Sequence, residues 1–330
     1  MAKPRALIVD EYGPIESYKL SDHDPGGPEP DEVQIQVMAA GVGYVDTLIA
    51  AGKYQVKLPL PCVPGIECAG VIRAVGSSVS HLAVGDRVMA SHARGGAYAQ
   101  LRNVPAEKVI ALPDTVDFAP ASIFRLNYTT ALYALKQRGG ITAGETLLVL
   151  GASGGVGYAA IEIGKALGAT VIASASTPEK RSLALRGGAD IAIDSTAKDW
   201  RDQVKQANQG KPVDLVFDPV GGDATEPAFR SLGWCGRHLM VGFAAGRIPA
   251  LPANLPLLKG ASLIGVDLHQ FVYREAEASD ANLCQLINML ADGSISPPID
   301  KSFALSDFAS AMNYVSSGQS VGRVVIDMTL

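Results

Sequence analysis

The sequence predicts an α/β protein in which a small, mostly antiparallel β-domain accompanies a doubly wound parallel sheet. Three observations predict it. The first third of the chain contains short segments of alternating polarity separated by glycine and proline turns. Strand and helix segments alternate between about residues 140 and 266. A glycine-rich turn, Gly151–Gly157, joins one such strand to one such helix.

The composition is that of a globular enzyme with two domains. The chain has 330 residues, 48% of them hydrophobic, which is enough for two cores. Its 28 basic and 33 acidic residues give a net charge of −5 with no long run of either sign. Nucleic acids and acidic membranes favour a basic face, so we expect neither as a partner.

We expect a cytoplasmic location. No segment reaches the roughly 18 uninterrupted apolar residues of a membrane helix. Residues 1–12 lack an apolar stretch followed by a small-residue cleavage site, so no secretory signal is expected. The cysteines form no CxxC pair and no dense cluster, which fits a reducing compartment: Cys62, Cys68, Cys235 and Cys284.

The N-terminal elements are expected to be strands. A loop rich in Pro, Gly and Asp, residues 22–32, separates the first two. The expected strands lie in residues 5–12, 31–42, 68–76, 85–90 and 97–105. Short, regularly spaced strands of this kind favour a barrel or sandwich.

The central elements begin with a helical period over residues 119–140, which ends on two glycines. A helix over Val156–Leu167 follows, and Pro178 opens another that stops at Gly187. The strands between and after these helices are apolar on both faces, as in a parallel sheet covered by helices. They are expected in residues 146–150, 170–175, 189–194, 213–218, 237–243 and 261–266.

The C-terminal elements are too few for a third domain. They comprise a helix over residues 280–290, a segment over 297–305, a helix over 306–316 and a strand over 322–328. We expect them to complete the first domain. The expected organisation is therefore a β-rich domain from residues 1–124, a nucleotide-binding domain from 125–266, and a return to the first domain from 267–330.

The glycine turn predicts dinucleotide binding. Gly154 would let the backbone approach a pyrophosphate, and Gly157 would let the helix pack closely on the strand. Gly155 and Val156 complete the helix N-terminus, whose N–H groups and dipole attract phosphate. Ala152 replaces the usual first glycine. The alternative is a tight strand–helix turn that binds no ligand.

The next strand favours NADPH over NADH. It ends without the Asp or Glu that would hold the ribose 2′-hydroxyl of NAD. Instead, a 2′-phosphate would meet three hydroxyl donors, Ser174, Ser176 and Thr177, and the cation of Lys180. The alternative is that Thr177 caps a helix and Lys180 is a solvated charge, and both descriptions can hold together.

These segments resemble the medium-chain dehydrogenase/reductase superfamily, specifically its zinc-independent NADPH:quinone oxidoreductase (zeta-crystallin-like) branch. The resemblance covers essentially the whole chain. It is carried by "AAGVGYVDTLIAAGKYQVKLPLPCVPGIECAGVIRAVG", "GDRVMA", "GGAYAQ", "GASGGVGYAAIEIGKALGATVIASASTPEK", "VDLVFDPVGGD" and "GRHLMVGFAAGRIPALPANLPLLKGASLIGV". It implies a GroES-like catalytic domain, formed by both chain ends around a central Rossmann domain. It also implies homodimers joined through residues 238–243 and 261–266.

The resemblance also implies that no metal is used. Zinc-using relatives carry Cys, His and Cys where this chain has Gly43, Ile66 and Leu126. A catalytic zinc needs about three such ligands. Without a Lewis acid, a simple carbonyl is difficult to reduce, whereas a quinone spreads its developing charge over a ring.

The expected function is NADPH-dependent reduction of quinones or similar conjugated carbonyls. The alternative is an enoyl-type reductase that transfers hydride to the β-carbon of an α,β-unsaturated carbonyl. A third interpretation, that the protein binds NADPH but acts as a structural or RNA-binding protein, is disfavoured by the acidic net charge.

Family members similar to this chain place substrate contacts near residues 43–47. Many have Asn where this chain has Gly43, so another donor is needed. Three tyrosines could donate to the substrate or stack on it, although a buried structural role is equally open for each: Tyr44, Tyr54 and Tyr128. Asp46 matches a position that the family keeps acidic, and it could transfer a proton or anchor the loop.

The remaining cofactor contacts are implied by the resemblance alone. Thr130 would touch the nicotinamide, and Gly242, Phe243 and Val266 would follow the later strands. Arg323 stands where relatives commonly have a basic residue near the cofactor, with a surface charge as the alternative. Ser195 replaces a tyrosine that relatives often place near the 2′-phosphate, which puts more weight on Lys180.

Overall fold

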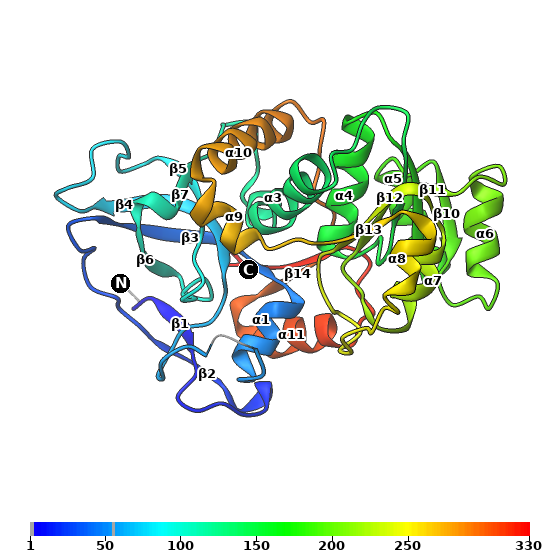
Figure 1. Cartoon of the computed structure of the whole chain (residues 1–330). Coiled ribbons are helices and arrows are strands. Elements are labelled where there is room, and N and C mark those ends of the chain that lie inside the picture. Colours follow the sequence, from blue (N-terminus) through cyan, green and yellow to red (C-terminus); the bar gives the residue numbers. More distant parts are fainter. Residues whose placement is uncertain (1–2, 55–56) are drawn as a thin grey trace. The chain divides into compact units, whose positions relative to one another are not determined.

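The computed structural model describes residues 3–54 and 57–330, and it divides into two compact units. The terminal unit comprises the chain up to Leu126 together with Ser296–Leu330, and the central unit comprises Asn127–Ile295. The first boundary lies two residues after the expected residue 124. The fold class, a mostly antiparallel domain and a doubly wound parallel sheet, is confirmed (Figure 1).

The second expected boundary, at residue 267, is wrong. Helices α9 (Leu268–Arg274) and α10 (Ala276–Ala291) belong to the central unit, and the chain returns at Ser296. The reason is their packing on the helical segment before β8. Phe271 of α9 stacks on Tyr133 with ring centroids 4.0 Å apart. On α10, Asn282 exchanges hydrogen bonds of 3.0 and 3.1 Å with Gln137.

The terminal unit is built on a seven-stranded sheet. Its order is β14-β15-β3-β4-β5-β7, with β6 paired to β3. The long strand β3 carries an alternating apolar face, and its partners β4, β6 and β15 run antiparallel to it. The strands span Glu32–Val42 (β3), Glu67–Val75 (β4), Arg87–Ser91 (β5), Leu101–Pro105 (β6), Val109–Ala111 (β7), Ile299–Ala304 (β14) and Arg323–Asp327 (β15).

Short elements complete the terminal unit. Strands β1 (Arg5–Ile8) and β2 (Lys19–Asp22) pair antiparallel. Helix α1 (Tyr44–Ala50) follows β3 directly and contacts α11 (Phe308–Ser316). The C-terminal strands β14 and β15 therefore share a sheet and a core with the N-terminal half of the chain.

The central unit has a six-stranded parallel sheet in the order β10-β9-β8-β11-β12-β13. The order reverses between β8 and β11, and the crevice at such a switch point is where ligands bind in open α/β sheets. Figure 1 shows helices flanking this sheet. The strands span Thr146–Val149 (β8), Thr170–Ala175 (β9), Ile191–Asp194 (β10), Val213–Asp218 (β11), Leu232–Met240 (β12) and Ser262–Gly265 (β13).

Helices connect the consecutive strands of this sheet, because parallel neighbours need a crossover. The principal ones are α4 (Gly155–Ala166), α5 (Pro178–Arg186), α6 (Trp200–Ala207), α7 (Thr225–Arg230) and α8 (Asn254–Lys259). Apolar residues of α6, α7 and α8 share one core with strands β8, β9 and β11. No helix among the described residues is long and apolar enough to cross a membrane.

The continuous helix expected over residues 119–140 is broken into three parts. These are α2 (Phe118–Ala121), α3 (Arg125–Leu132) and a π-helix, Tyr133–Arg138, that ends before Gly140 in the left-handed region (φ 54°). A tertiary contact sets the break. The N–H of Leu126, in the first turn of α3, donates to the Glu67 carboxylate at 2.8 Å, so a buried side chain caps the new helix.

Candidate functional site

The glycine turn after β8 is built by close backbone contacts. A Cβ atom at Gly157 would lie 2.3 Å from the Gly151 carbonyl oxygen, so helix α4 can approach the strand only with glycine there. Gly151 itself has φ +58°, which makes the turn that the usual first glycine would make. Ala152 can therefore occupy the position of the usual first glycine. It is buried, and its N–H donates a hydrogen bond to the Ser174 carbonyl.

The N-terminus of α4 faces the switch point. Gly154 caps the helix with an extended backbone and no side-chain cap. The N–H groups of Gly155, Val156 and Gly157 belong to the first helical turn, where no carbonyl of the helix can accept them. These donors, together with the helix dipole, make a cradle for a phosphate.

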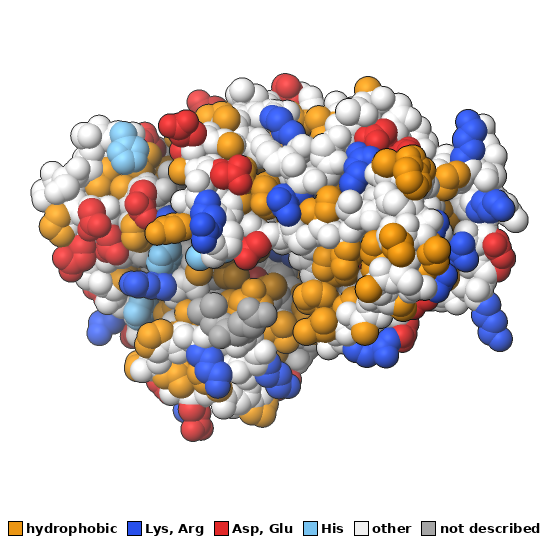
Figure 2. All heavy atoms as spheres, in the orientation of Figure 1, with side chains coloured by type: hydrophobic (Ala, Val, Ile, Leu, Met, Phe, Trp, Pro, Cys, Tyr) orange, Lys and Arg blue, Asp and Glu red, His pale blue; other side chains and the backbone are white. Residues whose placement is uncertain are grey.

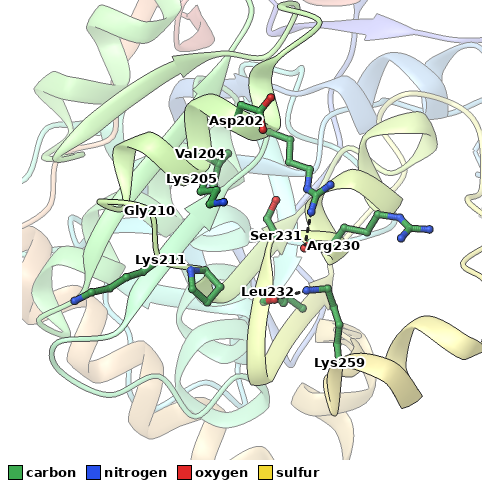
Figure 3. Close-up of a pocket in the computed structure, with 11 residues that line it drawn as sticks. Asp202, Val204, Lys205, Gly210, Lys211, Arg230, Ser231, Leu232 and Lys259 are labelled. Atoms are coloured by element: carbon green, nitrogen blue, oxygen red, sulfur yellow. Dashed lines mark hydrogen bonds between the residues drawn. The ribbon is translucent and has the colours of Figure 1, made fainter.

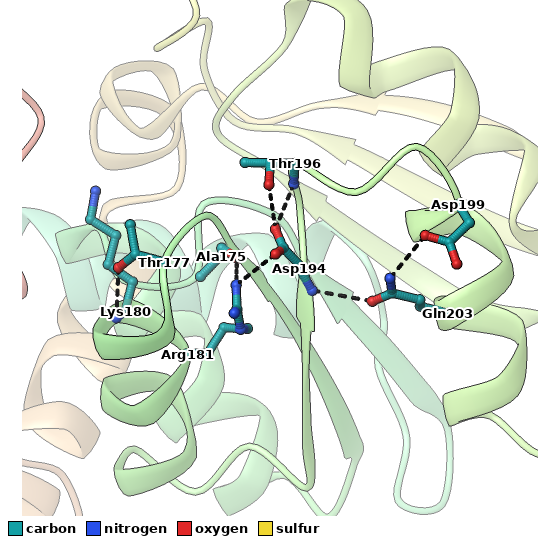
Figure 4. Close-up of polar contacts among 8 residues, drawn as sticks. All are labelled: Ala175, Thr177, Lys180, Arg181, Asp194, Thr196, Asp199 and Gln203. Carbon is teal, nitrogen blue, oxygen red and sulfur yellow. Dashed lines mark hydrogen bonds and ion pairs between the residues drawn. The ribbon is translucent and has the colours of Figure 1, made fainter.

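The end of β9 carries the residues expected at a 2′-phosphate (Figure 4). The Ser174 side chain is buried and Ser176 is exposed. Thr177 caps α5, its hydroxyl accepting the Lys180 N–H at 3.3 Å, so the capping role considered from the sequence is real. Lys180 lies one turn into α5, and its side chain is half-buried.

A charged pair that the sequence interpretation missed lies beside Lys180. Arg181 reaches from α5 to Asp194, at the end of β10, with an N–O distance of 3.2 Å, and it also donates to the Ala175 carbonyl (Figure 4). Asp194 accepts hydrogen bonds from the backbone and hydroxyl of Thr196 as well. The Asp194 carboxylate is therefore already occupied. Position in the sequence could not reveal it, because β9 and β10 pair only in the fold.

The turns after β11 and β12 form the other side of the switch point. Asp218, the last residue of β11, accepts from the backbones of Val220 and Gly221 and from the Thr225 hydroxyl. His238 lies 2.9 Å from the same carboxylate, and both side chains are fully buried. Burial alone would raise the pKa of Asp218, but the hydrogen bond and charge of His238 hold it below its usual value.

The expected cofactor residues Gly242 and Phe243 lie on these turns. Gly242 donates its N–H to the Asp218 carbonyl, and Phe243, which is exposed, lies against Gly221. Val266 donates to the Met240 carbonyl at the end of β12. The structure thus gathers these three residues at the carboxyl edge of the sheet, with the glycine turn.

Tyr128 and Thr130 lie on α3. The Tyr128 side chain is 2% exposed and its hydroxyl hydrogen-bonds the Glu162 carboxylate of α4. Burial and the Glu162 charge raise its pKa well above the usual value. This geometry fits the structural role considered for Tyr128. Thr130, two residues on, is half-buried.

In the terminal unit, Asp46 anchors the loop that precedes α1. Its side chain is 6% exposed, and its two oxygens accept the N–H groups of Gly43 at 2.8 Å and Ile66 at 3.0 Å. Burial raises the pKa of Asp46, while these hydrogen bonds and the Arg323 charge oppose the rise. The contacts fit the anchoring role, because both oxygens are engaged by backbone.

Glu67 is a functional candidate that the sequence interpretation missed. It is buried beside Ile66 and accepts the Leu126 N–H at 2.8 Å. Burial raises its pKa to about 7, with the Asp46 charge adding to the rise and Arg323 opposing it. A carboxylate inside the apolar run "GIECAGVI" was the available signal. The two carboxylates thus bring together positions 43, 66 and 126.

Arg323 completes this cluster. A Cβ atom at Gly43 would lie 3.1 Å from an Asp46 oxygen and 3.2 Å from an Arg323 Nη atom, so both side chains pack close against the glycine. The Nε of Arg323 is buried, with no hydrogen-bond partner among the described residues. A half-buried guanidinium with an unused donor is suited to an anionic or carbonyl ligand.

Tyr44 and Tyr54 lie at either end of this region of the terminal unit. Tyr44 begins α1 and is 45% exposed, and Tyr54 follows the helix, half-buried. Both phenols are more accessible than Tyr128. Among the described residues, no group of three or more His, Cys, Asp or Glu side chains could hold a metal ion.

Two domain families match the chain. Residues 29–114 match the alcohol dehydrogenase GroES-like domain, and residues 155–282 match the zinc-binding dehydrogenase family. A quinone oxidoreductase of Pseudomonas aeruginosa is 33% identical over 320 residues, which cover 96% of this chain and 97% of that protein. The chain belongs to the quinone oxidoreductase family of medium-chain dehydrogenases/reductases. It is therefore a member of an oxidoreductase enzyme family.

Solved structures agree with this assignment over the whole length. The quinone oxidoreductase of Escherichia coli complexed with NADPH has a TM-score of 0.89 at 28% identity, covering 98% of this chain and 99% of that one. The CurK enoyl reductase has a TM-score of 0.87 at 26% identity, with 99% of each chain covered. The likeness thus extends to proteins of two catalytic descriptions.

Proposed function

We propose that this protein reduces quinones or similar flat conjugated carbonyls with NADPH, without zinc. The observation that carries the proposal is the glycine turn and helix N-terminus at the switch point, with Lys180 at the end of the next strand. The named relatives, quinone oxidoreductases of matching length, support the substrate class.

The residues present fit NADPH. Gly154 and Gly155 carry no side chain at the start of α4, so a pyrophosphate would approach the N–H groups there. Ser174, Ser176, Thr177 and Lys180 would surround a 2′-phosphate. Arg181 pairs with Asp194, which removes a repulsive carboxylate from that corner. Gly242, Phe243, Val266 and Thr130 would line the remainder of the cofactor site.

Bound NADPH would supply a hydride, and the chain's own residues would position its acceptor. The phenols of Tyr44 and Tyr54 would stack on the substrate or donate hydrogen bonds to it, replacing the amide that Gly43 lacks. Arg323 would place positive charge beside Gly43. Asp46 holds the loop, and Tyr128 supports the core beside Glu162.

Two observations favour chemistry without a metal. Positions 43, 66 and 126 meet around Asp46 and Glu67, but their side chains are hydrogen or hydrocarbon and cannot ligate zinc. Both carboxylates already accept backbone hydrogen bonds. A quinone suits such a site, because its product anion is delocalised and a few donors stabilise it.

A second candidate function is reduction of an activated alkene. The likeness to the CurK enoyl reductase favours it, and Gly43, which lacks the amide that many relatives carry, would suit a substrate of different shape. In that reaction Glu67, with its pKa near 7, is the buried group of this cluster best matched to exchange protons at neutral pH.

Steady-state assays distinguish these proposals. The protein is assayed with NADPH and several quinones, and separately with an α,β-unsaturated ketone whose product is identified. We expect quinone reduction well above the uncatalysed rate. If no quinone is accelerated and the ketone loses its C=C bond, the enoyl reductase is correct. If neither substrate is reduced, both proposals fail.

We also propose a homodimer joined through β13. This strand is the last in the parallel sheet, so one of its edges has no partner strand among the described residues. Large apolar side chains are exposed near it on β12, α8 and β13: Trp234 (81%), Leu257, Leu258 and Leu263. Figure 2 shows hydrophobic side chains gathered over the α8 region. An isologous pairing of edges would cover them.

A further inference from the structure

A cationic pocket lies in the central unit, at the edge of the parallel sheet opposite the glycine turn. The glycine turn follows the carboxyl end of β8, whereas the pocket lies where β11 and β12 begin: Pro212 precedes β11, and Leu232 is the first residue of β12. Its walls come from α6, the loop after it, and the ends of α7 and α8 (Figure 3). The pocket is therefore separate from the nucleotide cradle.

The lining is strongly positive in an acidic protein. The cavity measures about 260 Å³, and five of its lining residues are basic against one acidic residue, Asp202: Arg201, Lys205, Lys211, Arg230 and Lys259. Arg230 pairs with Glu226 at 2.7 Å. Among the residues that the structure describes, none of the other four cations has a carboxylate within 4.0 Å. Their charge is uncompensated although the whole chain carries −5.

Uncharged backbone groups hold two of these cations in place. Arg201 donates to the Arg230 carbonyl at 3.3 Å, and Lys259 donates to the Leu232 carbonyl at 2.6 Å (Figure 3). These contacts orient the cations without neutralising them. Burial lowers the pKa of Lys259, and the nearby charges of Arg201 and Arg230 lower it further. Holding these like charges close together costs electrostatic free energy. A bound anion would remove that repulsion.

We propose that this pocket binds a small phosphate-bearing anion with at least two negative charges, of the class of pyrophosphate or a phosphomonoester. Guanidinium and ammonium groups together are the usual partners of phosphate oxygens. The volume is below the roughly 300 Å³ at which pockets for drug-sized ligands begin, so the ligand is compact. A nucleic acid needs an extended basic stripe, whereas these charges line one concave site. The inference does not depend on the proposed redox function.

Isothermal titration of the full chain with pyrophosphate tests the inference. With the nucleotide cradle filled by saturating NADPH, we expect one saturable site whose affinity falls with added salt. Lys205→Gln and Lys259→Gln should each weaken binding by about tenfold, the effect of one charge-assisted contact. Lys259 also bonds a backbone carbonyl, so thermal melts are used to establish that both variants fold. Lys205 forms no ion pair among the described residues, so its variant provides the cleaner test.

Lys198→Gln is the matched control, since it removes an exposed lysine of the same unit that does not line the pocket. It should leave pyrophosphate binding at the pocket unchanged. The inference is overturned if no saturable binding occurs, or if Lys198→Gln weakens binding as much as the two pocket variants do. It is also overturned if a single-stranded oligonucleotide binds this surface and pyrophosphate does not displace it.

Discussion

At the residue scale, two buried carboxylates in the terminal unit share a neighbourhood but differ in their bonding. Asp46 accepts two backbone N–H groups, and Glu67 accepts one. Burial opposes the charge of each, and hydrogen bonds to the ionised form compensate. Glu67 has less compensation, and its pKa is raised to about 7. It therefore changes charge near neutral pH, while its bond to Leu126 fixes the start of α3.

Glu67 should make stability depend on pH. Its pKa rises from 4.5 to about 7 on folding, so the folded state binds the proton more tightly. The resulting stabilisation is complete below pH 4.5 and is lost as pH rises through 7. Glu67→Gln, which stays neutral, should gain stability relative to wild type between pH 5 and 8, by at most roughly 3 kcal/mol. Urea unfolding of both proteins across this pH range measures the gain, and parallel pH curves would contradict it.

Lys180 should discriminate between the two nicotinamide cofactors. Lys180→Ala should raise KM for NADPH by about tenfold, the effect of losing one charged contact, and change KM for NADH little. Arg186→Ala is the control, because Arg186 is exposed in the last turn of the same helix. Equal changes in both KM values for Lys180→Ala would remove the basis of the NADPH proposal.

At the element scale, the contact between β8 and α4 fixes the nucleotide cradle. Gly157 is needed there because of packing, independently of any ligand. Gly157→Ala would push a Cβ atom into the Gly151 backbone, which cannot move aside as a flexible side chain would. We expect a loss of roughly 1–3 kcal/mol in the free energy of unfolding, measured by urea denaturation.

Gly27→Ala is the matched control for that prediction. A Cβ atom at Gly27 would meet nothing within 4 Å, and its φ is not in the left-handed region. Its free energy of unfolding should stay close to that of wild type. Equal stability of Gly157→Ala and wild type would show that the turn can relax.

Sequence periodicity correctly predicted those elements whose ends are set by residues within the same segment. The strand ending at Ala175 and the helix opened by Pro178 formed where their composition indicated. The segment 119–140 did not form one helix, because Glu67 caps a new start at Leu126. A helical period cannot reveal a cap supplied by a strand about sixty residues earlier.

At the scale of the whole molecule, the chain returns to its first unit later than its pattern indicated. Helix α10 is amphipathic, and a helix of either unit would be. The amphipathic pattern therefore cannot show which unit the helix packs in; only its contacts in the fold show that. Those partners include Gln137, which the sequence does not connect with Asn282. The same limit hid the Asp218–His238 and Arg181–Asp194 pairs, since each joins separate strands or helices. Glycine spacing, by contrast, located the cradle, because its geometry is local.

Assembly can be tested on the apolar surface near β13. Leu258→Glu would place a charge among Trp234, Leu257 and Leu263, and a desolvated charge at an interface is costly. Sedimentation equilibrium should show a dimer for wild type and a monomer for this variant. Val84→Glu, at an exposed apolar residue of the terminal unit, should remain dimeric. A monomeric wild type would contradict the homodimer.

The central claim is that this chain catalyses hydride transfer from NADPH to a quinone. The most direct measurement is anaerobic single turnover with NADPH deuterated at the transferred position, monitoring both NADPH and quinone. We expect loss of one NADPH per quinone reduced, and a primary isotope effect on the rate of that hydride transfer. NADPH oxidation no faster with protein than without it would contradict the account.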